Sequence, residues 1–567
     1  MIDPGFVQPW SITLDGQQPG WLIAMMNLAF YLVAVVCLTS SLVSVPSVAA
    51  NLAPSEIDLK PGPSLPDKDA SNGFFSTFRE TVDQLYYDGT EFLKKNLALT
   101  HNENNFAPLV ETDKLRIVVP NLCDRSVKHY SGYINIAEDK HMFFESRSKP
   151  STDPLVLWLN GGPGDSSATG LLFELGPCSV VSEGRTTKRN AYSWTNAASM
   201  IFLDQPVDVG FSYADPGVSV KNSADAAKDV YSFLQLFFEQ FPEYSKLPFH
   251  VAGESYGGES SYRCSDTSNS CLGIYAPNIA SVIWHANQAL VVSSKPRSTH
   301  INLASVIIGN GIVDPYIQIP SIVDYVCNGP YPVYDDPHGP ECTALRSNIP
   351  RCQLLIKLCN LYASDLTCAP ASRYCRSRLF EPSMKSDLNW YDLRKKCDAK
   401  DRPEHCYERT PWVETWMNDA KVKAAIGVDP ERSFRSFNMD MNRDFNRRGD
   451  GVRNAAKLLP ELVDGGVRLL VYAGKADMMA NYMGNERWVE NLETKFETEF
   501  SATKGLPWIA AGSKDVAGEV RSAGGTAGSG GNLTFVTVFE AGHMVAHDQP
   551  AAALDLFTRW ITNVPLS

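Results

Sequence analysis

The chain has 567 residues, of which 44% are hydrophobic and 20% are charged, a composition typical of a globular protein with a large core. Its length predicts two or more structural units. Its formal net charge of −13 argues against nucleic acid as a partner, because a phosphate-binding surface needs a basic stripe and none is visible.

Residues 1–50 contain an uncharged apolar segment. No residue from Leu22 to Val48 is charged, and an apolar run over 28–38 precedes small residues, as before the cleavage site of a signal peptide. The absence of Lys and Arg before Lys60 fits such a peptide poorly. We expect a targeting segment with an N-terminal extension, and an alternative start at Met25 or Met26. An uncleaved membrane anchor is the other interpretation.

Residues 51–115 differ from the rest of the chain. Proline-rich spacing gives way to apolar residues at helical intervals between Phe74 and Leu97. The pattern favours a pro-region over a plain N-terminal extension.

From residue 116 onward, short apolar runs alternate with amphipathic helical segments such as Ser223 to Phe241. This alternation predicts an α/β fold with a mostly parallel sheet and helices on both faces, built from residues 116–314 and 443–567. The predicted strands cover residues 155–159, 200–203, 249–252, 306–308, 469–472 and 535–539.

A glycine-rich turn, Asn160-Gly161-Gly162-Pro163-Gly164, follows the strand over 155–159. It lacks the G-x-G-x-x-G spacing of a dinucleotide loop. Its glycines allow the backbone to approach a substrate oxygen closely, so the turn is a candidate for one oxyanion donor.

The segment Gly253-Glu254-Ser255-Tyr256-Gly257 has the form Gly-x-Ser-x-Gly and directly follows a predicted strand. In a nucleophile elbow, the glycines flank a turn that is too tight for side chains and that lifts the serine hydroxyl clear of the sheet. The motif alone is weak, and the strand before it strengthens it. It predicts Ser255 as a nucleophile and the Tyr256 N–H as an oxyanion donor.

Residues 315–442 interrupt the alternation and are predicted to form an inserted, disulfide-rich cap. CxxC pairs and matched histidines are absent from its sequence, so we predict no metal and no cofactor. Disulfides require an oxidising compartment. Eight of the chain's thirteen cysteines lie here: Cys327, Cys342, Cys352, Cys359, Cys368, Cys375, Cys397 and Cys406.

Two further candidates follow predicted strands near the C-terminus. Asp477 comes shortly after the strand over 469–472, and His543 after the strand over 535–539. The order Ser, acid, His is the one that the elbow requires, so His543 is the predicted base for Ser255 and Asp477 its partner. His547 is interpreted as an ordinary surface histidine. Residues 503–531, rich in Gly, Ser and Ala, are predicted to be a surface loop.

These residues, with several longer motifs between Cys123 and Pro550, resemble the serine carboxypeptidases, most closely the fungal carboxypeptidase Y-like enzymes. The resemblance implies an α/β-hydrolase fold with an inserted cap. The motifs include Trp158-Leu159-Asn160-Gly161-Gly162-Pro163-Gly164, Phe173-Glu174-Leu175-Gly176-Pro177, Asp204-Gln205-Pro206, Gly309-Asn310-Gly311 and Gly542-His543-Met544-Val545.

The resemblance also implies roles for individual residues. Asn160, Glu174 and Glu254 would bind the terminal carboxylate of the substrate. Two carboxyl groups held close together share one proton, so activity is expected to favour acid conditions. Gly162 and Tyr256 would be the oxyanion donors. The leaving-residue pocket would be lined by Thr169, Phe173 and Met544, and the apolar pocket for the penultimate residue by Met479 and Ala480.

The family's disulfides imply five pairs here. The expected bonds are Cys123–Cys178, Cys327–Cys342, Cys352–Cys375, Cys359–Cys368 and Cys397–Cys406.

The chain departs from the family's pattern in three places, one of which is a strand around His141 to Glu145 that is about three residues short. The family's cysteine pair is missing at Asp165 and near Phe437. After Gly258, about fifteen polar residues, Glu259 to Gly273, separate the elbow from the expected helix. A retained intron is the preferred explanation, and a genuine loop closed by Cys264–Cys271 is the alternative.

The predicted function is that of a serine-type carboxypeptidase that releases single C-terminal residues through an acyl-enzyme at acid pH. The alternatives are an acyltransferase on the same scaffold and a catalytically impaired binding or chaperone-like homologue. Peptide and protein C-termini are the predicted partners, with no oligomeric state implied. A membrane would be involved only if the N-terminal segment stays uncleaved. The expected location is the secretory pathway, vacuolar or extracellular, and Asn532 is a candidate for N-glycosylation.

Overall fold

The computed structural model describes residues 110–112, 114–124, 127–148, 153–258, 275–292, 298–384, 387–397, 406–407, 410–526 and 528–567. The predicted targeting segment, the proposed pro-region up to residue 109 and the insertion Glu259 to Gly273 lie outside these residues. Within the described ranges, no helix has the length and apolar character that crossing a membrane requires.

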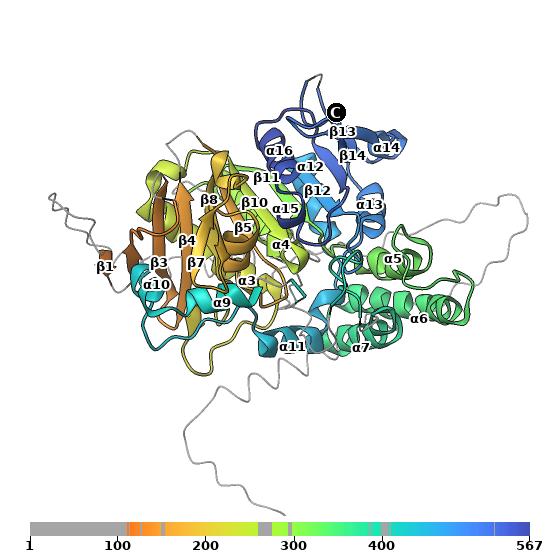
Figure 1. Cartoon of the computed structure of the whole chain (residues 1–567), viewed down its shortest axis with the longest axis horizontal. Coiled ribbons are helices and arrows are strands. Elements are labelled where there is room, and N and C mark those ends of the chain that lie inside the picture. The colour runs from red at the N-terminus through yellow and green to blue at the C-terminus, as the bar shows by residue number, and fades with distance from the viewer. Residues whose placement is uncertain are drawn as a thin grey trace, which may run out of the picture. The chain divides into compact units, whose positions relative to one another are not determined.

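Six parallel strands form the centre of one large sheet (Figure 1). The five residues of Leu155–Leu159 are all buried, as are all six of Phe249–Glu254, because helices cover both faces at this point. The mostly parallel core predicted from the apolar runs is confirmed. In spatial order the strands are β8 (Ser199–Leu203), β5 (Leu155–Leu159), β10 (Phe249–Glu254), β11 (Leu303–Gly309), β12 (Arg468–Gly474) and β15 (Leu533–Val538).

Antiparallel strands extend the sheet on both sides. One edge carries β4 (Lys140–Ser148), β3 (Lys128–Ala137), β2 (Leu115–Val118) and β1 (Val110–Thr112), with the short β9 (Tyr213–Ala214) also paired to β4. The other edge carries β14 (Val516–Ala523) and β13 (Leu506–Ile509). A separate hairpin consists of β6 (Cys178–Val181) and β7 (Thr186–Arg189).

The prediction of a surface loop over residues 503–531 is wrong for β13 and β14. Trp508 and Val520 are buried, and β14 pairs along its length with β15. Gly518 faces Thr537 so closely that a Cβ there would overlap the Thr537 carbonyl oxygen. A small residue that suggested a loop, Gly518, therefore allows two strands to approach each other closely.

Helices cover the two faces of the sheet with alternate strand residues beneath them. Leu157 belongs to the hydrophobic cluster of one face, which includes residues of α3 (Ser223–Gln240), α4 (Tyr275–Val292), α12 (Leu459–Asp464), α13 (Tyr482–Glu490) and α14 (Glu497–Ala502). Trp158 belongs to the opposite cluster, which includes α9 (Thr410–Met417), α10 (Ala420–Ala425), α15 (Val545–Asp548) and α16 (Pro550–Ile561).

A third hydrophobic cluster lies among the helices that follow β11. Three buried disulfides belong to it, and Met478, next to the candidate acid, is part of the same cluster. In Figure 1 these helices lie together beside the sheet, with α11 (Met439–Arg448) next to α7. The elements are α5 (Pro315–Asn328), α6 (Pro340–Tyr362), α7 (Asp365–Cys375), η5 (Arg376–Phe380) and α8 (Glu381–Ser383).

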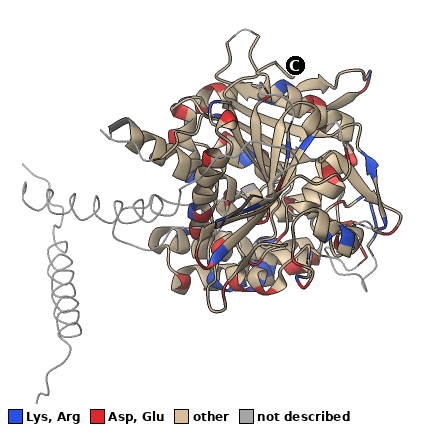
Figure 2. Cartoon of the chain, turned by 90° about the vertical axis from the view of Figure 1, so that its left-hand side faces the viewer, with Lys and Arg blue, Asp and Glu red and all other residues tan. Residues whose placement is uncertain are grey.

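Basic and acidic residues are interspersed along the chain in the view of Figure 2. This distribution agrees with the acidic net charge of −13 and with the argument against a phosphate-binding stripe.

Candidate active site

Ser255 lies in a strained turn at the carboxyl end of β10. Its φ of 59° is in the left-handed region, which non-glycine residues seldom adopt outside functional turns. A Cβ at Gly253 would overlap the Gly257 carbonyl oxygen, so the flanking glycine is required by space. The chain continues into the short turn η4 (Ser255–Gly258). This is the geometry that the Gly-x-Ser-x-Gly pattern predicts.

The glycine-rich turn after β5 packs directly on the Ser255 turn. β5 and β10 are parallel neighbours, so both turns leave the sheet at the same edge. A Cβ at Gly161 would lie 2.8 Å from both the Ser255 Cβ and the Glu254 carbonyl oxygen, and it would overlap the Tyr256 nitrogen. Gly162 has a φ of 103°, which favours glycine. The backbone groups of the two predicted oxyanion donors are thus brought together.

Asp477 is fully buried and held by three donors. The backbone nitrogens of Met479 and Ala480 donate to its carboxylate at 2.9 and 3.2 Å, and Asn310 Nδ2 donates to Asp477 Oδ2 at 2.8 Å. The Asn310 Oδ1 atom in turn accepts from Gly474 N at 3.1 Å. The carboxylate therefore has a fixed orientation.

His543 Nδ1 lies 2.7 Å from Asp477 Oδ2, so the predicted base and acid are joined. The His543 backbone nitrogen donates to the Tyr391 carbonyl oxygen at 2.7 Å, and the two side-chain rings are 5.0 Å apart. Burial lowers the pKa of His543, but the Asp477 carboxylate and then Glu174 raise it, and the net shift is upward from 6.5.

The other ring nitrogen, His543 Nε2, is buried and has no hydrogen-bond partner among the described residues. It is the nitrogen that would take the proton from Ser255. A hydrogen bond between nucleophile and base is often long without substrate and tightens only in the complex.

Glu174 and Glu254 are buried side by side. Asn160 Nδ2 donates to Glu174 Oε1 at 3.0 Å, while Asn160 Oδ1 accepts from Trp158 Nε1 and Gly170 N. These two donors fix the Asn160 amide so that its NH₂ group points to the acid pair. Glu174 ends the single-turn helix η1 (Gly170–Glu174).

Each carboxyl group shifts the pKa of the other, so the two lie close together, and a proton shared between them would avoid two adjacent buried negative charges. Burial and then the Glu174 carboxylate raise the pKa of Glu254 well above 4.5, and burial raises the pKa of Glu174. The charge of Asp477 also acts on Glu254, and that of His543 acts on Glu174, so the acid pair lies beside the His543–Asp477 pair.

The predicted pocket residues lie on the same segments as the candidate site residues. Thr169 and Phe173 are buried on or next to η1, and Met544 follows His543. Met479 and Ala480 are in the turn that binds the Asp477 carboxylate. The interpretation of His547 as a surface residue is wrong. It is half-buried, and its ring stacks on Phe173 at 4.1 Å, because α15 turns the chain back over the pocket wall.

All five disulfides implied by the resemblance are present. Five of the ten cysteines lie on the long helix α6 and its partner α7, and four of them form the two bonds that join these helices. The bonds are Cys123–Cys178, Cys327–Cys342, Cys352–Cys375, Cys359–Cys368 and Cys397–Cys406.

Sequence reasoning did not assign a role to Asn310 or Tyr391, although Asn310 binds the predicted acid Asp477 and Tyr391 binds the predicted base His543. Asn310 lies within the motif Gly309-Asn310-Gly311, which carried the family resemblance without a function. In the structure Asn310 has a φ of 43°, a left-handed conformation that asparagine tolerates better than most residues. No local pattern marks Tyr391, which acts through its backbone oxygen.

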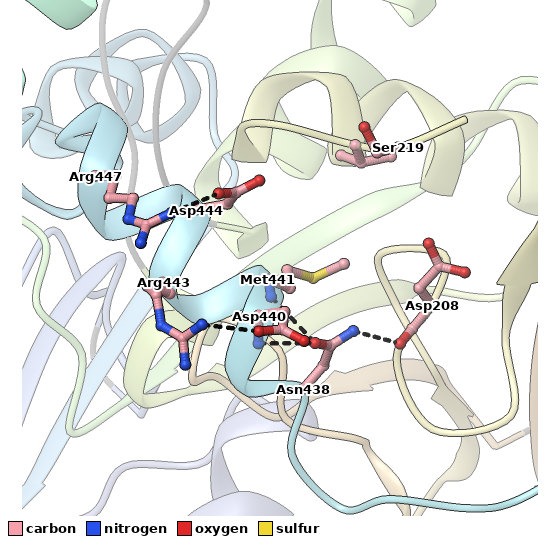
Figure 3. A pocket seen from close by; sticks show the side chains of 9 residues that line it. Asp208, Ser219, Asn438, Asp440, Met441, Arg443, Asp444 and Arg447 are labelled. Carbon is pink, nitrogen blue, oxygen red and sulfur yellow. Dashed lines mark hydrogen bonds and ion pairs between the residues drawn. The ribbon is translucent and has the colours of Figure 1, made fainter. Parts of the chain in front are cut away.

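A cavity of about 220 Å³ lies elsewhere, beside α11. Figure 3 shows Arg443 paired with Asp440 and Arg447 paired with Asp444, while Asn438 Nδ2 donates to the Asp208 carbonyl oxygen. The predicted catalytic, carboxylate-binding and pocket residues do not line it. We therefore place the candidate active site at the carboxyl ends of the central strands.

Comparison with known proteins identifies the family of the chain. The sequence profile described as serine carboxypeptidase matches residues 120–563. Carboxypeptidase Y homolog A from Sclerotinia sclerotiorum is 42% identical over 445 residues, covering 78% of this chain and 74% of that protein. The homolog A from Talaromyces stipitatus is 43% identical, covering 77% and 73%.

A solved structure has the same fold. The prohormone-processing carboxypeptidase Kex1(delta)p from Saccharomyces cerevisiae superposes with a TM-score of 0.63 at 24% identity, covering 78% of this chain and 94% of that one.

Proposed function

The chain belongs to the serine carboxypeptidase family, and we propose that Ser255, His543 and Asp477 are its catalytic triad. The protein is a serine-type carboxypeptidase, a hydrolase that acts on the C-termini of peptides. The observation that carries the residue assignment is the buried Glu174–Glu254 pair beside the hydrogen-bonded His543 and Asp477.

The geometry supports an acyl-enzyme mechanism. His543 Nε2 takes the proton of the Ser255 hydroxyl while Ser255 Oγ attacks the scissile carbonyl carbon. Asp477 accepts the Nδ1–H bond and stabilises the imidazolium. His543 then gives the proton to the departing amino acid. A water molecule, deprotonated by the same ring, hydrolyses the ester and restores Ser255.

The negative oxygen of the tetrahedral intermediate needs two donors. The backbone N–H groups of Gly162 and Tyr256 belong to the two turns that pack on each other at Gly161. We assign the oxyanion site to these groups.

The acid pair explains an exopeptidase better than a general esterase. A protonated Glu254 or Glu174 donates a hydrogen bond to the substrate carboxylate, as does the Asn160 amide, without placing a full negative charge next to it. Ionisation of the pair would repel the substrate. Substrate binding should therefore weaken as the pH rises.

The side chains around this centre would form the two substrate pockets. Thr169, Phe173 and Met544 would contact the leaving residue. Met479 and Ala480 would contact the penultimate residue through an apolar surface.

The alternatives are less well supported. An acyltransferase would use the triad but has no need of a buried acid pair for a peptide carboxylate. A binding protein would need neither the strained Ser255 turn nor the three donors on Asp477.

The test is hydrolysis of an N-blocked dipeptide and of its C-terminal amide by the full chain. We expect release of the C-terminal amino acid from the free acid, little reaction with the amide, and loss of both in Ser255→Ala. Equal rates with acid and amide would refute carboxylate recognition. No hydrolysis of either by the wild-type chain would refute the catalytic proposal.

The five disulfides support an oxidising compartment, and we propose the secretory pathway, with delivery to a vacuole or export. We also propose four features of the chain: cleavage of residues 1–50, a pro-region over 51–115, a cap over 315–442 and a glycan on Asn532. Peptide mapping of the secreted protein by mass spectrometry tests the cleavage of residues 1–50, the pro-region and the glycan.

A further inference from the structure

Asp450 is a buried acid outside the triad that contacts the residue after the nucleophile. The Tyr256 hydroxyl donates to Asp450 Oδ2 at 2.5 Å, and Ser223 Oγ donates to the same oxygen at 2.7 Å. Asp450, Ser223 and Tyr256 are all buried. Tyr256 is also the residue whose backbone N–H is assigned to the oxyanion site.

The position of Asp450 is set by the helices beyond β11. The preceding Gly449 has a φ of 71°, and a Cβ there would overlap the Cys368 backbone. Cys368 is bonded to Cys359. The turn that carries Asp450 is therefore pressed against the start of α7.

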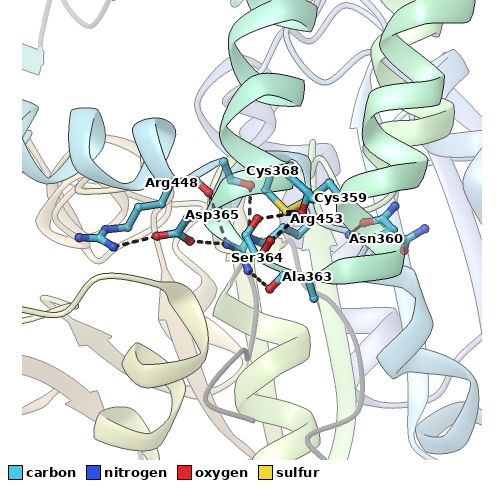
Figure 4. Close-up of a disulfide and its surroundings, with 11 residues drawn as sticks. Cys359, Asn360, Ala363, Ser364, Asp365, Cys368, Arg448 and Arg453 are labelled. Atoms are coloured by element: carbon cyan, nitrogen blue, oxygen red, sulfur yellow. Dashed lines mark hydrogen bonds and ion pairs between the residues drawn. A yellow bond between two sulfur atoms is a disulfide. The ribbon is translucent and has the colours of Figure 1, made fainter. Parts of the chain in front are cut away.

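Ion pairs with the same helix also hold this turn. Asp365, the first residue of α7, binds Arg453 Nη2 and Arg448 Nη1, each at 2.9 Å (Figure 4). Arg448 and Arg453 flank Asp450 in sequence, and the Arg453 side chain is buried. Asp450 thus has a fixed position relative to α7 and the Cys359–Cys368 disulfide.

The Ser255 turn needs an external constraint because its φ of 59° is strained. A hydrogen bond from the side chain of the next residue supplies one. Loss of that bond would let the Tyr256 peptide group rotate, and its N–H would no longer point at the oxyanion.

We propose that Asp450 is a positioning residue for the oxyanion site, acting through the Tyr256 hydroxyl and tying the nucleophile turn to α7. This inference rests on the proposed function, and it concerns how one oxyanion donor is held in place. A purely structural role for Asp450 would affect stability and leave the chemical step unchanged.

The chain offers a matched set of variants. Tyr256→Phe keeps the backbone N–H and removes the hydroxyl bond to Asp450. Asp450→Asn weakens the same bond from the other side. Ser223→Ala removes the second bond to Asp450 Oδ2 without touching the nucleophile turn, so it controls for the loss of a buried hydrogen bond.

We would measure kcat and KM on an N-blocked dipeptide, and the inhibition constant of a peptide aldehyde, whose hemiacetal oxygen occupies the oxyanion site. Tyr256→Phe should lower kcat about 10- to 100-fold, as expected for a displaced oxyanion donor, with KM changed by less than about twofold. The aldehyde inhibition constant should rise by a similar factor. Asp450→Asn should resemble Tyr256→Phe, and the double variant should be no worse than the poorer single one.

Ser223→Ala should lower the unfolding temperature about as much as Tyr256→Phe while kcat stays within about threefold of wild type, since a buried hydrogen bond away from the reacting atoms contributes mainly to stability. Unchanged kcat and aldehyde affinity in Tyr256→Phe would overturn the proposal, as would an equal loss of kcat in Ser223→Ala. If Asp450→Asn does not fold, the comparison of Tyr256→Phe with Ser223→Ala still tests whether Asp450 positions the oxyanion donor. An inactive wild-type chain would refute the proposed function instead.

Discussion

Asp165 and Phe437 face each other across an isolated antiparallel β-bridge. Ser166 N donates to the Ser436 carbonyl oxygen at 2.8 Å, and Asn438 N donates to the Gly164 carbonyl oxygen at 2.9 Å, one on either side of the pair. These are the positions where the family resemblance implies a missing disulfide. The backbone pairing thus joins them without a covalent bond, next to the oxyanion turn.

This relationship predicts that Asp165→Cys/Phe437→Cys forms a disulfide. In an antiparallel pair flanked in this way, the Cα atoms are about 4.5 Å apart, within the range of about 4.4–6.8 Å that disulfides span. Relative to Asp165→Ser/Phe437→Ser, we expect a gain of about 2–4 kcal/mol in the free energy of unfolding. Thiol titration and urea denaturation measure both effects, and two additional free thiols in the folded protein would contradict the prediction.

The triad should behave as one unit. Ser255→Ala and His543→Ala should each lower kcat on the order of a millionfold, and the double variant should be no slower than either, because each change already abolishes the same proton transfer. Single-turnover kinetics on a blocked dipeptide ester provide the measurement. Multiplicative losses in the double variant would show that the two residues act separately.

Glu254→Gln should extend substrate binding to higher pH. The pKa of Glu254 is raised above 4.5, so the acid pair holds its proton at low pH and loses it as the pH rises through the raised value. Gln keeps a neutral donor at every pH. We expect the KM of the wild type to increase with pH, and that of Glu254→Gln to remain nearly constant, in assays across pH 4 to 8. Parallel profiles would rule out the shared proton as the cause.

The same shift affects stability. Between 4.5 and the raised pKa, the folded protein binds a proton at Glu254 that the unfolded chain has released, so the free energy of unfolding falls as the pH rises. Glu254→Gln should remove this part of the pH dependence. Urea denaturation of both proteins across the window provides the comparison.

Glu174→Gln should move the acid limb of kcat to lower pH. Asp477 and Glu174 raise the pKa of His543, and only the neutral ring can accept the Ser255 proton. Removing the Glu174 charge lowers the pKa of His543, so the neutral ring persists further into the acid range. The measurement is kcat at saturating substrate against pH, and an acid limb that stays in place would contradict the assignment of that limb to His543.

Gly161→Ala should reduce activity without unfolding the protein. The new Cβ would lie 2.8 Å from the Ser255 Cβ and the Glu254 carbonyl oxygen, so the two turns must separate. A displacement of about 1 Å at a catalytic group costs on the order of 100-fold in rate. Gly505→Ala, where the nearest atom is 3.6 Å from the new Cβ, is the control and should retain wild-type kcat. Circular dichroism checks that both variants fold.

The central strands and the nucleophile turn were predictable because both are local in sequence. Runs such as residues 155–159 are apolar at every position, which only a strand buried on both faces allows. The glycines around Ser255 indicate a tight turn, because the space that excludes side chains there is set by residues close in sequence. The order Ser255, Asp477, His543 then limited which acid and which base belong to it.

The strands over 506–523 were missed because their glycines and alanines pack on a partner strand that no local window reveals. The position of His547 against Phe173 depends on how α15 returns over the pocket.

The sequence by itself determined the α/β core and the family and predicted the nucleophile, because apolar periodicity and tight turns are properties of consecutive residues. Only the tertiary structure decided that Asn310 holds Asp477, that Tyr391 holds His543 and that Asp450 holds Tyr256. The partners in these bonds are between 152 and 194 residues apart, and what brings them within 3 Å is the register of parallel strands and the packing of helices on the sheet. Hydrogen-bond partners over such distances follow from the folded geometry and from no local pattern.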